Sequence, residues 1–139
     1  MSLVVDASLT LAWVFERQSL HERQLADRVL DGLLIEEAFV PWIWHLEVAN
    51  ALLVAERRGV LTQARSTDFL ARLGALPIRT DPASPLETTE RITSLGRSFQ
   101  LSSYDASYLE LALRLGLGLA SFDRALLVAA SAAGVAVYD

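Results

Sequence analysis

The chain has 139 residues, no cysteine and a formal net charge of −5 at pH 7. This length fits a single domain, residues 1–139, large enough to bury a core without disulfides or structural zinc. Without thiolates, any metal must be held by oxygen or imidazole ligands, which favours hard cations such as Mg²⁺ or Mn²⁺.

Hydrophobic residues make up 53% of the chain, a high share for a small domain. Because excess apolar surface is often covered by a partner or a second copy, we expect a dimer or a complex. We expect neither a signal peptide nor a membrane span, and therefore a cytoplasmic protein, because no apolar run reaches about 18 residues. The negative charge disfavours nucleic acid unless metal neutralises a local acidic cluster.

The first half of the chain opens with a short apolar run and then reads mainly as helix. We expect a strand over residues 3–5, helices over 7–16 and 20–34, a strand over 38–40, and a helix over 43–58. Pro41 should stop the second strand. Gly59 should end the following helix as its C-terminal cap.

The second half alternates in the same way. We expect a helix over residues 62–73, an edge strand over 76–79, helices over 85–99 and 102–115, a buried strand over 117–122, a helix over 124–133 and a last strand over 135–137. Ser84 and Glu87 form a predicted capping box, with Pro85 at the first helical position. Short apolar strands separated by helices favour an α/β fold, with a central parallel sheet of four or five strands and helices on both faces.

Two aspartates follow predicted strands directly. Asp6 comes after residues 3–5, and Asp123 comes after the apolar run that ends at Phe122. In a parallel sheet ligands bind beyond the carboxyl ends of the strands, so both carboxylates are candidates for a functional site. The alternative for each is a simple N-cap of the helix that follows.

Two further acids lie on helix faces that look inward. Glu47 shares its face with apolar residues, where an unpaired charge is costly, unless it sits at the partly exposed rim of that face. Asp105 lines up with Tyr108 and Leu109, although it fits a capping box with Ser102 equally well. Glu110 points away and is predicted to be a solvated surface residue.

Converging carboxylates repel one another, and divalent metal relieves that repulsion. Metal held by carboxylates can activate water against a phosphodiester without a nucleophilic side chain. The two histidines add little, since His21 is expected on the surface and His45 is expected to pack rather than to assist Glu47. Separately, Glu110, the acid predicted to lie on the surface of its helix, is expected to form an ion pair with Arg114 one turn away.

Four blocks of the sequence resemble the PIN domain, and specifically its VapC-type toxins. They occur in the order and approximate spacing of that family over nearly the whole chain. The blocks are Val4-Val5-Asp6-Ala7-Ser8, Pro41 followed by Leu46-Glu47-Val48-Ala49-Asn50-Ala51-Leu52, Tyr104-Asp105-Ala106-Ser107-Tyr108-Leu109-Glu110-Leu111-Ala112, and Leu119-Ala120-Ser121-Phe122-Asp123.

The resemblance implies a Mg²⁺- or Mn²⁺-dependent endoribonuclease, inhibited by a cognate antitoxin and usually dimeric. It implies that Asp6, Glu47, Asp105 and Asp123 are the catalytic and metal-binding acids, with Asp6 and Asp105 as principal ligands. Three polar positions beside the acids would orient them, namely Ser8, Asn50 and Ser121.

All twelve basic residues are arginines, and the chain has no lysine. Phosphate contacts outside the metals must therefore come from arginine. The candidates are Arg17, Arg57, Arg58, Arg97 and Arg124. The aromatic side chains of Trp13, Trp42, Trp44, Phe15 and Phe39 are expected to pack in the core, the alternative being a ledge for RNA bases or for an antitoxin helix.

Three other functions compete with the nuclease. An aspartate- and Mg²⁺-dependent phosphotransfer domain also gathers acids at strand ends. It would resemble families that use a lysine on the phosphoryl group, and this chain has no lysine. A P-loop enzyme is excluded because the glycine-rich lysine motif is missing. A non-catalytic PIN-like binding module remains an alternative.

Overall fold

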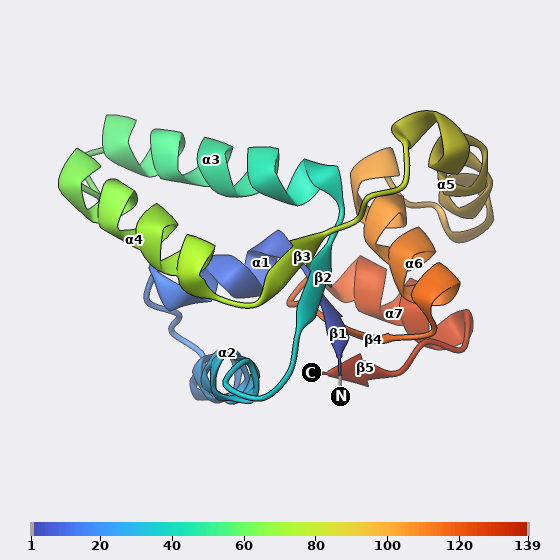
Figure 1. Cartoon of the computed structure of the whole chain (residues 1–139), viewed down its shortest axis with the longest axis horizontal. Coiled ribbons are helices and arrows are strands. Elements are labelled where there is room, and N and C mark those ends of the chain that lie inside the picture. The colour runs from blue at the N-terminus through green and yellow to red at the C-terminus, as the bar shows by residue number, and fades with distance from the viewer. Residues whose placement is uncertain (1, 139) are drawn as a thin grey trace.

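A single parallel sheet organises the molecule (Figure 1). The computed structural model describes residues 2–138, and the order of strands in the sheet is β3-β2-β1-β4-β5. Every pairing between neighbouring strands is parallel. The strands are β1 (Leu3–Val5), β2 (Ala38–Val40), β3 (Ile78–Thr80), β4 (Gly118–Ala120) and β5 (Val137–Tyr138). The predicted α/β fold is confirmed, and β3 lies at an edge as predicted.

Helices connect consecutive strands and lie to either side of the sheet. In Figure 1, α3 and α4 lie to one side of the central strands, and α5, α6 and α7 lie to the other. The helices are α1 (Ala7–Thr10), α2 (Leu20–Gly32), α3 (Trp42–Arg57), α4 (Gln63–Ala75), α5 (Pro85–Phe99), α6 (Ser103–Leu115) and α7 (Arg124–Ala132), with a 3₁₀ turn, η1 (Leu11–Trp13), after α1. No helix among residues 2–138 is both long and apolar enough to span a membrane.

The centre of the sheet is fully enclosed. Val4 and Val5 of β1, Val40 of β2 and Leu119 of β4 have no exposed surface. Strands covered on both faces read as continuous apolar runs, which is why the sequence reveals them so clearly. Burial on both sides also fixes the backbone at the carboxyl ends of β1 and β4, where Asp6 follows one strand and Ser121 the other.

The first predicted helix is shorter than expected. The sequence predicts one helix over residues 7–16, but α1 ends at Thr10 and continues only as the 3₁₀ turn to Trp13. Beyond it the amides of Val14 and Phe15 both bond to the carbonyl of Leu11. Bulky aromatic and β-branched residues favour helix weakly, and the indole of Trp13 is tied to the carbonyl of Ala26 in α2 at 2.9 Å. Tertiary packing therefore ends the helix early.

The helix ends predicted from capping residues are confirmed. Ser84 and Glu87 form the full capping box at the start of α5, with Pro85 in its first turn. Gly59 follows the C-cap of α3 with a φ of 71°, and Gly116 caps α6 with a φ of 66°. Both angles lie in the left-handed region that glycine adopts without strain.

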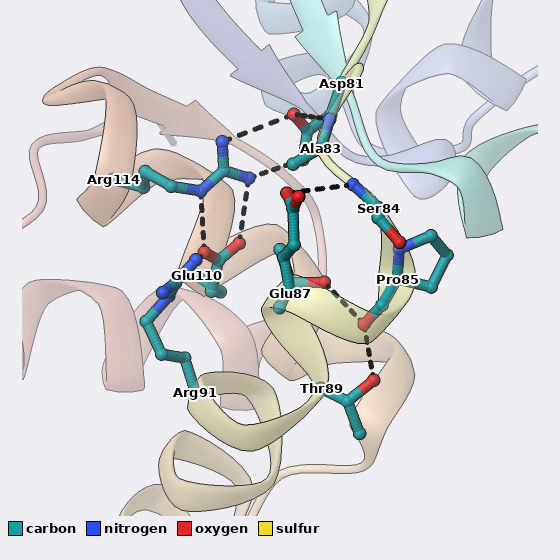
Figure 2. Close-up of polar contacts among 10 residues, drawn as sticks. Asp81, Ala83, Ser84, Pro85, Glu87, Thr89, Arg91, Glu110 and Arg114 are labelled. Atoms are coloured by element: carbon teal, nitrogen blue, oxygen red, sulfur yellow. Dashed lines mark hydrogen bonds and ion pairs between the residues drawn. The ribbon is translucent and has the colours of Figure 1, made fainter.

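An ion-pair network fastens α5 and α6 to the end of β3 (Figure 2). Nε of Arg114 lies 2.8 Å from Oε1 of Glu110, and the same guanidinium pairs with Asp81, which follows β3. Arg91 of α5 reaches Glu110 at 3.2 Å. Two buried acids are thus matched by two arginines, and the pKa of Arg114 is raised by its hydrogen bonds to Glu110 and Asp81.

The prediction for Glu110 is half right. Its pairing with Arg114 is confirmed, but the prediction that it is a solvated surface residue is wrong, because it is only 3% exposed. Helix α5 packs on α6 and covers this face, and Arg91 comes from that covering helix. Helical spacing identified the partner but carried no information about α5.

Replacing Arg114 should test how much the network stabilises the fold. Arg114→Ala leaves Glu110 and Asp81 buried without their shared counter-charge, a loss expected to lower the free energy of unfolding by about 3 kcal/mol. The value sits low in the usual range because the Arg114 side chain is 27% exposed. Urea denaturation measures the change.

The matched control is Arg72→Ala in α4. Arg72 pairs with Asp68 at 2.9 Å, but both side chains are more than half exposed, at 79% and 63%. Exposed pairs of this kind contribute less than about 1 kcal/mol. Equal losses for the two variants would contradict a stabilising role for the buried network.

Candidate functional site

Asp6 is a buried carboxylate at the carboxyl end of the central strand. It is 4% exposed, and its Oδ2 accepts hydrogen bonds from Ser8 at 2.7 Å and from Ser121 at 2.6 Å. Asp6 occupies the N-cap position of α1, yet its side chain makes no capping hydrogen bond. The alternative of a simple helix cap is therefore wrong, since the carboxylate turns toward the end of β4 instead.

The two serines that bond to Asp6 also bond to the backbone at and just before Asp123. The Ser121 hydroxyl accepts from the Asp123 amide at 2.9 Å, and the Ser8 hydroxyl accepts from the Phe122 amide at 3.0 Å. Asp123 does cap α7, because its Oδ1 accepts from the Leu126 amide at 2.9 Å. That bond engages one carboxylate oxygen and fixes the orientation of the other.

Glu47 is joined to this region by Tyr108. The phenol donates to Oε1 of Glu47 at 2.6 Å and accepts a long contact of 3.4 Å from the amide of Ala7, next to Asp6. Tyr108 has no exposed surface. Burial and its acidic neighbours raise the pKa of this phenol, so it stays a donor. The phenol therefore ties α3 to the start of α1.

Sequence reasoning placed Tyr108 on the inward face of α6 but assigned it no role. A signal was available, because a buried tyrosine hydroxyl almost always finds a polar partner. Glu47 was the unpaired acid on another inward face, so the two residues were natural candidates for each other. Neither sequence spacing nor periodicity relates α3 to α6, so the match needed the fold.

Asp105 lies near enough to the other three acids to be affected by their charge, and it has little support of its own. Ser102 caps α6 by accepting from the Asp105 amide at 3.1 Å, but within residues 2–138 no group donates to the Asp105 carboxylate. The alternative of a reciprocal capping box is thus only half formed. Burial and repulsion from Asp123, Asp6 and Glu47 raise the pKa of Asp105 to about 6.

Neighbouring carboxylates also act on Asp6 and Glu47 in the acidic cluster, by which we mean Asp6, Glu47, Asp105 and Asp123. Burial raises the pKa of Asp6, offset in part by its serine hydrogen bonds, and Asp123 raises it further. Burial also raises the pKa of Glu47, with Tyr108 opposing and with Asp6 and Asp123 adding to the rise. No arginine within residues 2–138 forms an ion pair with any of the four carboxylates, so these residues offer the cluster no paired counter-charge.

Oxygen donors without a basic partner suit a hard divalent cation, and the cluster fits such an ion by its chemistry. Among residues 2–138, however, no three acidic or histidine side chains already stand in a group that could hold a metal. The carboxylates are thus close enough to affect one another's pKa but too far apart to coordinate one ion together. A cation would have to draw the carboxylates together.

Several residues predicted near the site lie elsewhere. His45 bonds to Thr80 at 2.8 Å and lies edge-on to Trp44, and no hydrogen bond within residues 2–138 joins it to Glu47, but the residue is exposed, so the predicted packing is only partly realised. Burial lowers its pKa. His21 is exposed, as predicted. Asn50 is exposed on α3, and its side chain takes part in none of the hydrogen bonds found within residues 2–138, so its role stays a prediction.

Core packing is confirmed for most of the aromatic side chains. Trp44 is 4% exposed, and its indole donates to Thr10 at 3.0 Å. Trp13, Phe15 and Phe39 are partly buried against the core. Trp42 differs, because it is 63% exposed at the start of α3.

Among residues 2–138, Arg17 is the one candidate arginine whose side chain contacts the loop that carries Asp123, since Arg124 follows Asp123 directly but its side chain is exposed. The guanidinium of Arg17 lies 4.8 Å from the ring centroid of Phe122. The others are exposed, and within the described range no hydrogen bond or ion pair engages their side chains. They are Arg57, Arg58, Arg97 and Arg124.

The chain belongs to the PIN domain family, because the family model described as PIN domain matches residues 3–131. Members of this family are generally nucleases and generally use divalent metal ions. The resemblance to PIN domains inferred from the sequence is thereby confirmed. No curated protein sequence matches the chain.

Solved structures share the fold over nearly the whole chain. PAE2754 from Pyrobaculum aerophilum aligns with a TM-score of 0.70 and 24% identity, covering 99% of this chain and 92% of that one. FitAcB from Neisseria gonorrhoeae aligns with a TM-score of 0.65 and 16% identity, covering 100% and 97%. FitAB bound to a DNA fragment aligns with a TM-score of 0.63 and 17% identity, covering 99% of this chain and 94% of that one. At these identities the likeness shows the fold alone.

Removing one charge from the acidic cluster should stabilise the metal-free protein. Asp105→Asn keeps the shape of the side chain and relieves repulsion from three neighbouring acids. We expect the melting temperature in EDTA at pH 7 to rise by a few degrees, as for a change of about 1 kcal/mol in a domain of this size. Glu90→Gln, an exposed acid of α5, is the control and should leave the melting temperature unchanged. A lower melting temperature for Asp105→Asn would contradict the repulsion.

Proposed function

We propose that this protein is a Mg²⁺- or Mn²⁺-dependent endoribonuclease that hydrolyses RNA phosphodiester bonds and acts as the toxin of a toxin–antitoxin pair. The observation that carries the proposal is structural. Asp6 and Asp123 are joined through Ser8 and Ser121, Tyr108 ties Glu47 to the same region, and no ion pair within residues 2–138 involves these acids or Asp105. Acids kept in that state destabilise a fold, so their presence calls for a function.

The four acids would have different roles in binding the metal. Asp6 and Asp105 are the proposed principal ligands, with Glu47 and Asp123 completing the set. When bound, a divalent ion supplies a water of lowered pKa and stabilises the charge that develops on the phosphate. The hydrogen bonds from Ser8 and Ser121 hold Asp6, Tyr108 holds Glu47, and the α7 cap holds Asp123. Asp105 is left free to adjust to the ion.

This chemistry requires no nucleophilic side chain. A phosphotransfer domain would need a lysine on the phosphoryl group, and the chain contains none. The remaining alternative is a non-catalytic PIN-like binding module, for which the acids would have no chemical role. An assay of RNA cleavage separates the two.

We also propose that the protein is cytoplasmic and that it binds two kinds of partner, an antitoxin and a second copy of the chain. Support comes from a line of exposed apolar residues on α3, where Trp42, Leu46 and Leu53 are 63%, 68% and 47% exposed. Their spacing puts them on one face of the helix. Leu70 of α4 is also 48% exposed. Apolar side chains gathered in this way are a typical interface.

Cleavage should depend on metal and on the acids. Wild-type protein is expected to cut single-stranded or structured RNA in Mn²⁺ or Mg²⁺, and EDTA should abolish the cutting. Asp6→Ala and Asp105→Ala should each reduce the rate at least about a hundredfold, because loss of even the groups that support a metal ligand costs 10- to 100-fold. Gel analysis of labelled RNA measures the rates, with Glu90→Gln as a control expected to cut normally.

If both alanine variants cut as fast as wild type, the activity belongs to another site or to a contaminant. The toxin role has a separate test, since expression of the wild-type chain should arrest bacterial growth and the two substitutions should relieve the arrest. Arrest that persists with inactive variants would contradict it.

Tyr108→Phe tests whether the phenol supports the metal through Glu47. The substitution removes the donor to Glu47 and the long contact of 3.4 Å from the Ala7 amide, but it keeps the buried ring. We therefore expect a folded protein whose affinity for Mn²⁺ falls about tenfold. Isothermal titration with Mn²⁺ measures the affinity, and Tyr104→Phe is the matched control, since Tyr104 is 58% exposed. Equal Mn²⁺ affinities for Tyr108→Phe and wild type would show that Glu47 needs no such support.

A further inference from the structure

Arg17 is the arginine that the fold holds against the loop bearing Asp123. It follows η1 and precedes α2, and its guanidinium carbon lies 4.8 Å from the ring centroid of Phe122. Phe122 stands between Ser121 and Asp123, and its amide donates to Ser8, which in turn donates to Asp6. Arg17 therefore borders the acidic cluster through a single residue.

The guanidinium is held from two sides. Its central carbon lies over the Phe122 ring, and its Nε donates to Oε2 of Glu22 at 2.8 Å. Glu22 is itself placed by the start of α2, where its amide bonds to the Ser19 hydroxyl at 3.3 Å. Within residues 2–138 the hydrogen bond of this guanidinium uses Nε, and its contact with Phe122 is with the aromatic ring. They leave the two terminal amino groups of Arg17 to bind a ligand.

Such an arginine is prepared for a phosphate. Its two terminal amino groups form a planar fork that matches phosphate oxygens. Because Phe122 and Glu22 already restrict the side chain, binding would cost little further conformational entropy. The Arg17 side chain is 36% exposed, so a ligand can reach it.

The charge of the site makes this contact useful. An acidic cluster in a chain of net charge −5 repels the phosphates of a nucleic acid strand. Bound metal would offset the charge only at the phosphate that is cut. The neighbouring phosphates need a cation from the chain, and Arg17 is the candidate with a defined position next to the cluster.

We propose that Arg17 binds a backbone phosphate of single-stranded RNA next to the one that is cleaved, through its two terminal amino groups. The inference rests on the proposed nuclease function. It adds a binding residue outside the acids and assigns it the sugar–phosphate backbone rather than a base, so its contribution should not depend on RNA sequence.

The test measures RNA affinity in a background that does not cut. Asp105→Asn serves as the parent, and binding of a fluorescently labelled, mixed-sequence RNA of about 20 nucleotides is followed by anisotropy. Adding Arg17→Ala should weaken binding about tenfold, as expected for loss of one charged hydrogen-bonded contact. The slope of log affinity against log salt should become shallower by about 0.7, the value for one phosphate contact to a single strand.

Two further variants sharpen the result. Arg17→Lys keeps the charge but loses the fork, so it should bind between the parent and Arg17→Ala. Arg65→Ala removes an exposed arginine of α4 that has no place in the site, and it should bind like the parent. Melting temperatures check that each variant is folded, and Arg17→Gln replaces Arg17→Ala should the shorter side chain prevent folding.

The proposal is overturned if Arg17→Ala binds with the parent's affinity and salt slope, or if Arg65→Ala weakens binding as much. Cleavage by the Asp105→Asn parent at the wild-type rate would instead overturn the proposed function. The two failures are therefore distinguishable.

Discussion

Repulsion among like charges at one edge of the sheet is the constraint around which the molecule is arranged. Asp6 and Asp123 are brought there by β1 and β4, and Glu47 and Asp105 are brought there by α3 and α6. The surrounding contacts hold the acids in place rather than neutralise them, through two serine hydroxyls, one phenol and a helix cap. Hydrogen bonds of this kind position carboxylates and leave their charge available to a cation.

A second group of buried acids in the same chain shows the contrast. Asp81 and Glu110 are about as enclosed as Asp6, yet Arg114 and Arg91 match their charge. That network joins α5, α6 and the end of β3, and each of its acids has an arginine partner. Burial alone therefore does not mark a functional site in this fold. The distinction lies in whether the fold supplies the counter-charge, and for the acidic cluster it does not.

Sequence patterns predicted those parts of the fold that depend on local rules. Apolar runs such as residues 3–5 located the strands, and Gly59 and Ser84 located helix ends. The carboxyl ends of parallel strands share one edge, which is why the order of residues along the chain was enough to group Asp6 with Asp123. The remaining features depend on packing between distant elements. Burial of Glu110 beneath α5, the bond from Tyr108 to Glu47 and the early end of α1 have no signature in periodicity.

The central claim is that the acidic cluster holds a divalent ion. Anomalous diffraction from crystals grown with Mn²⁺ tests it directly, because the metal itself is located. We expect a peak among Asp6, Glu47, Asp105 and Asp123, with Asp6 and Asp105 nearest to it and the carboxylates drawn inward. A well-diffracting crystal with no peak there, or with manganese bound only elsewhere, would contradict the account.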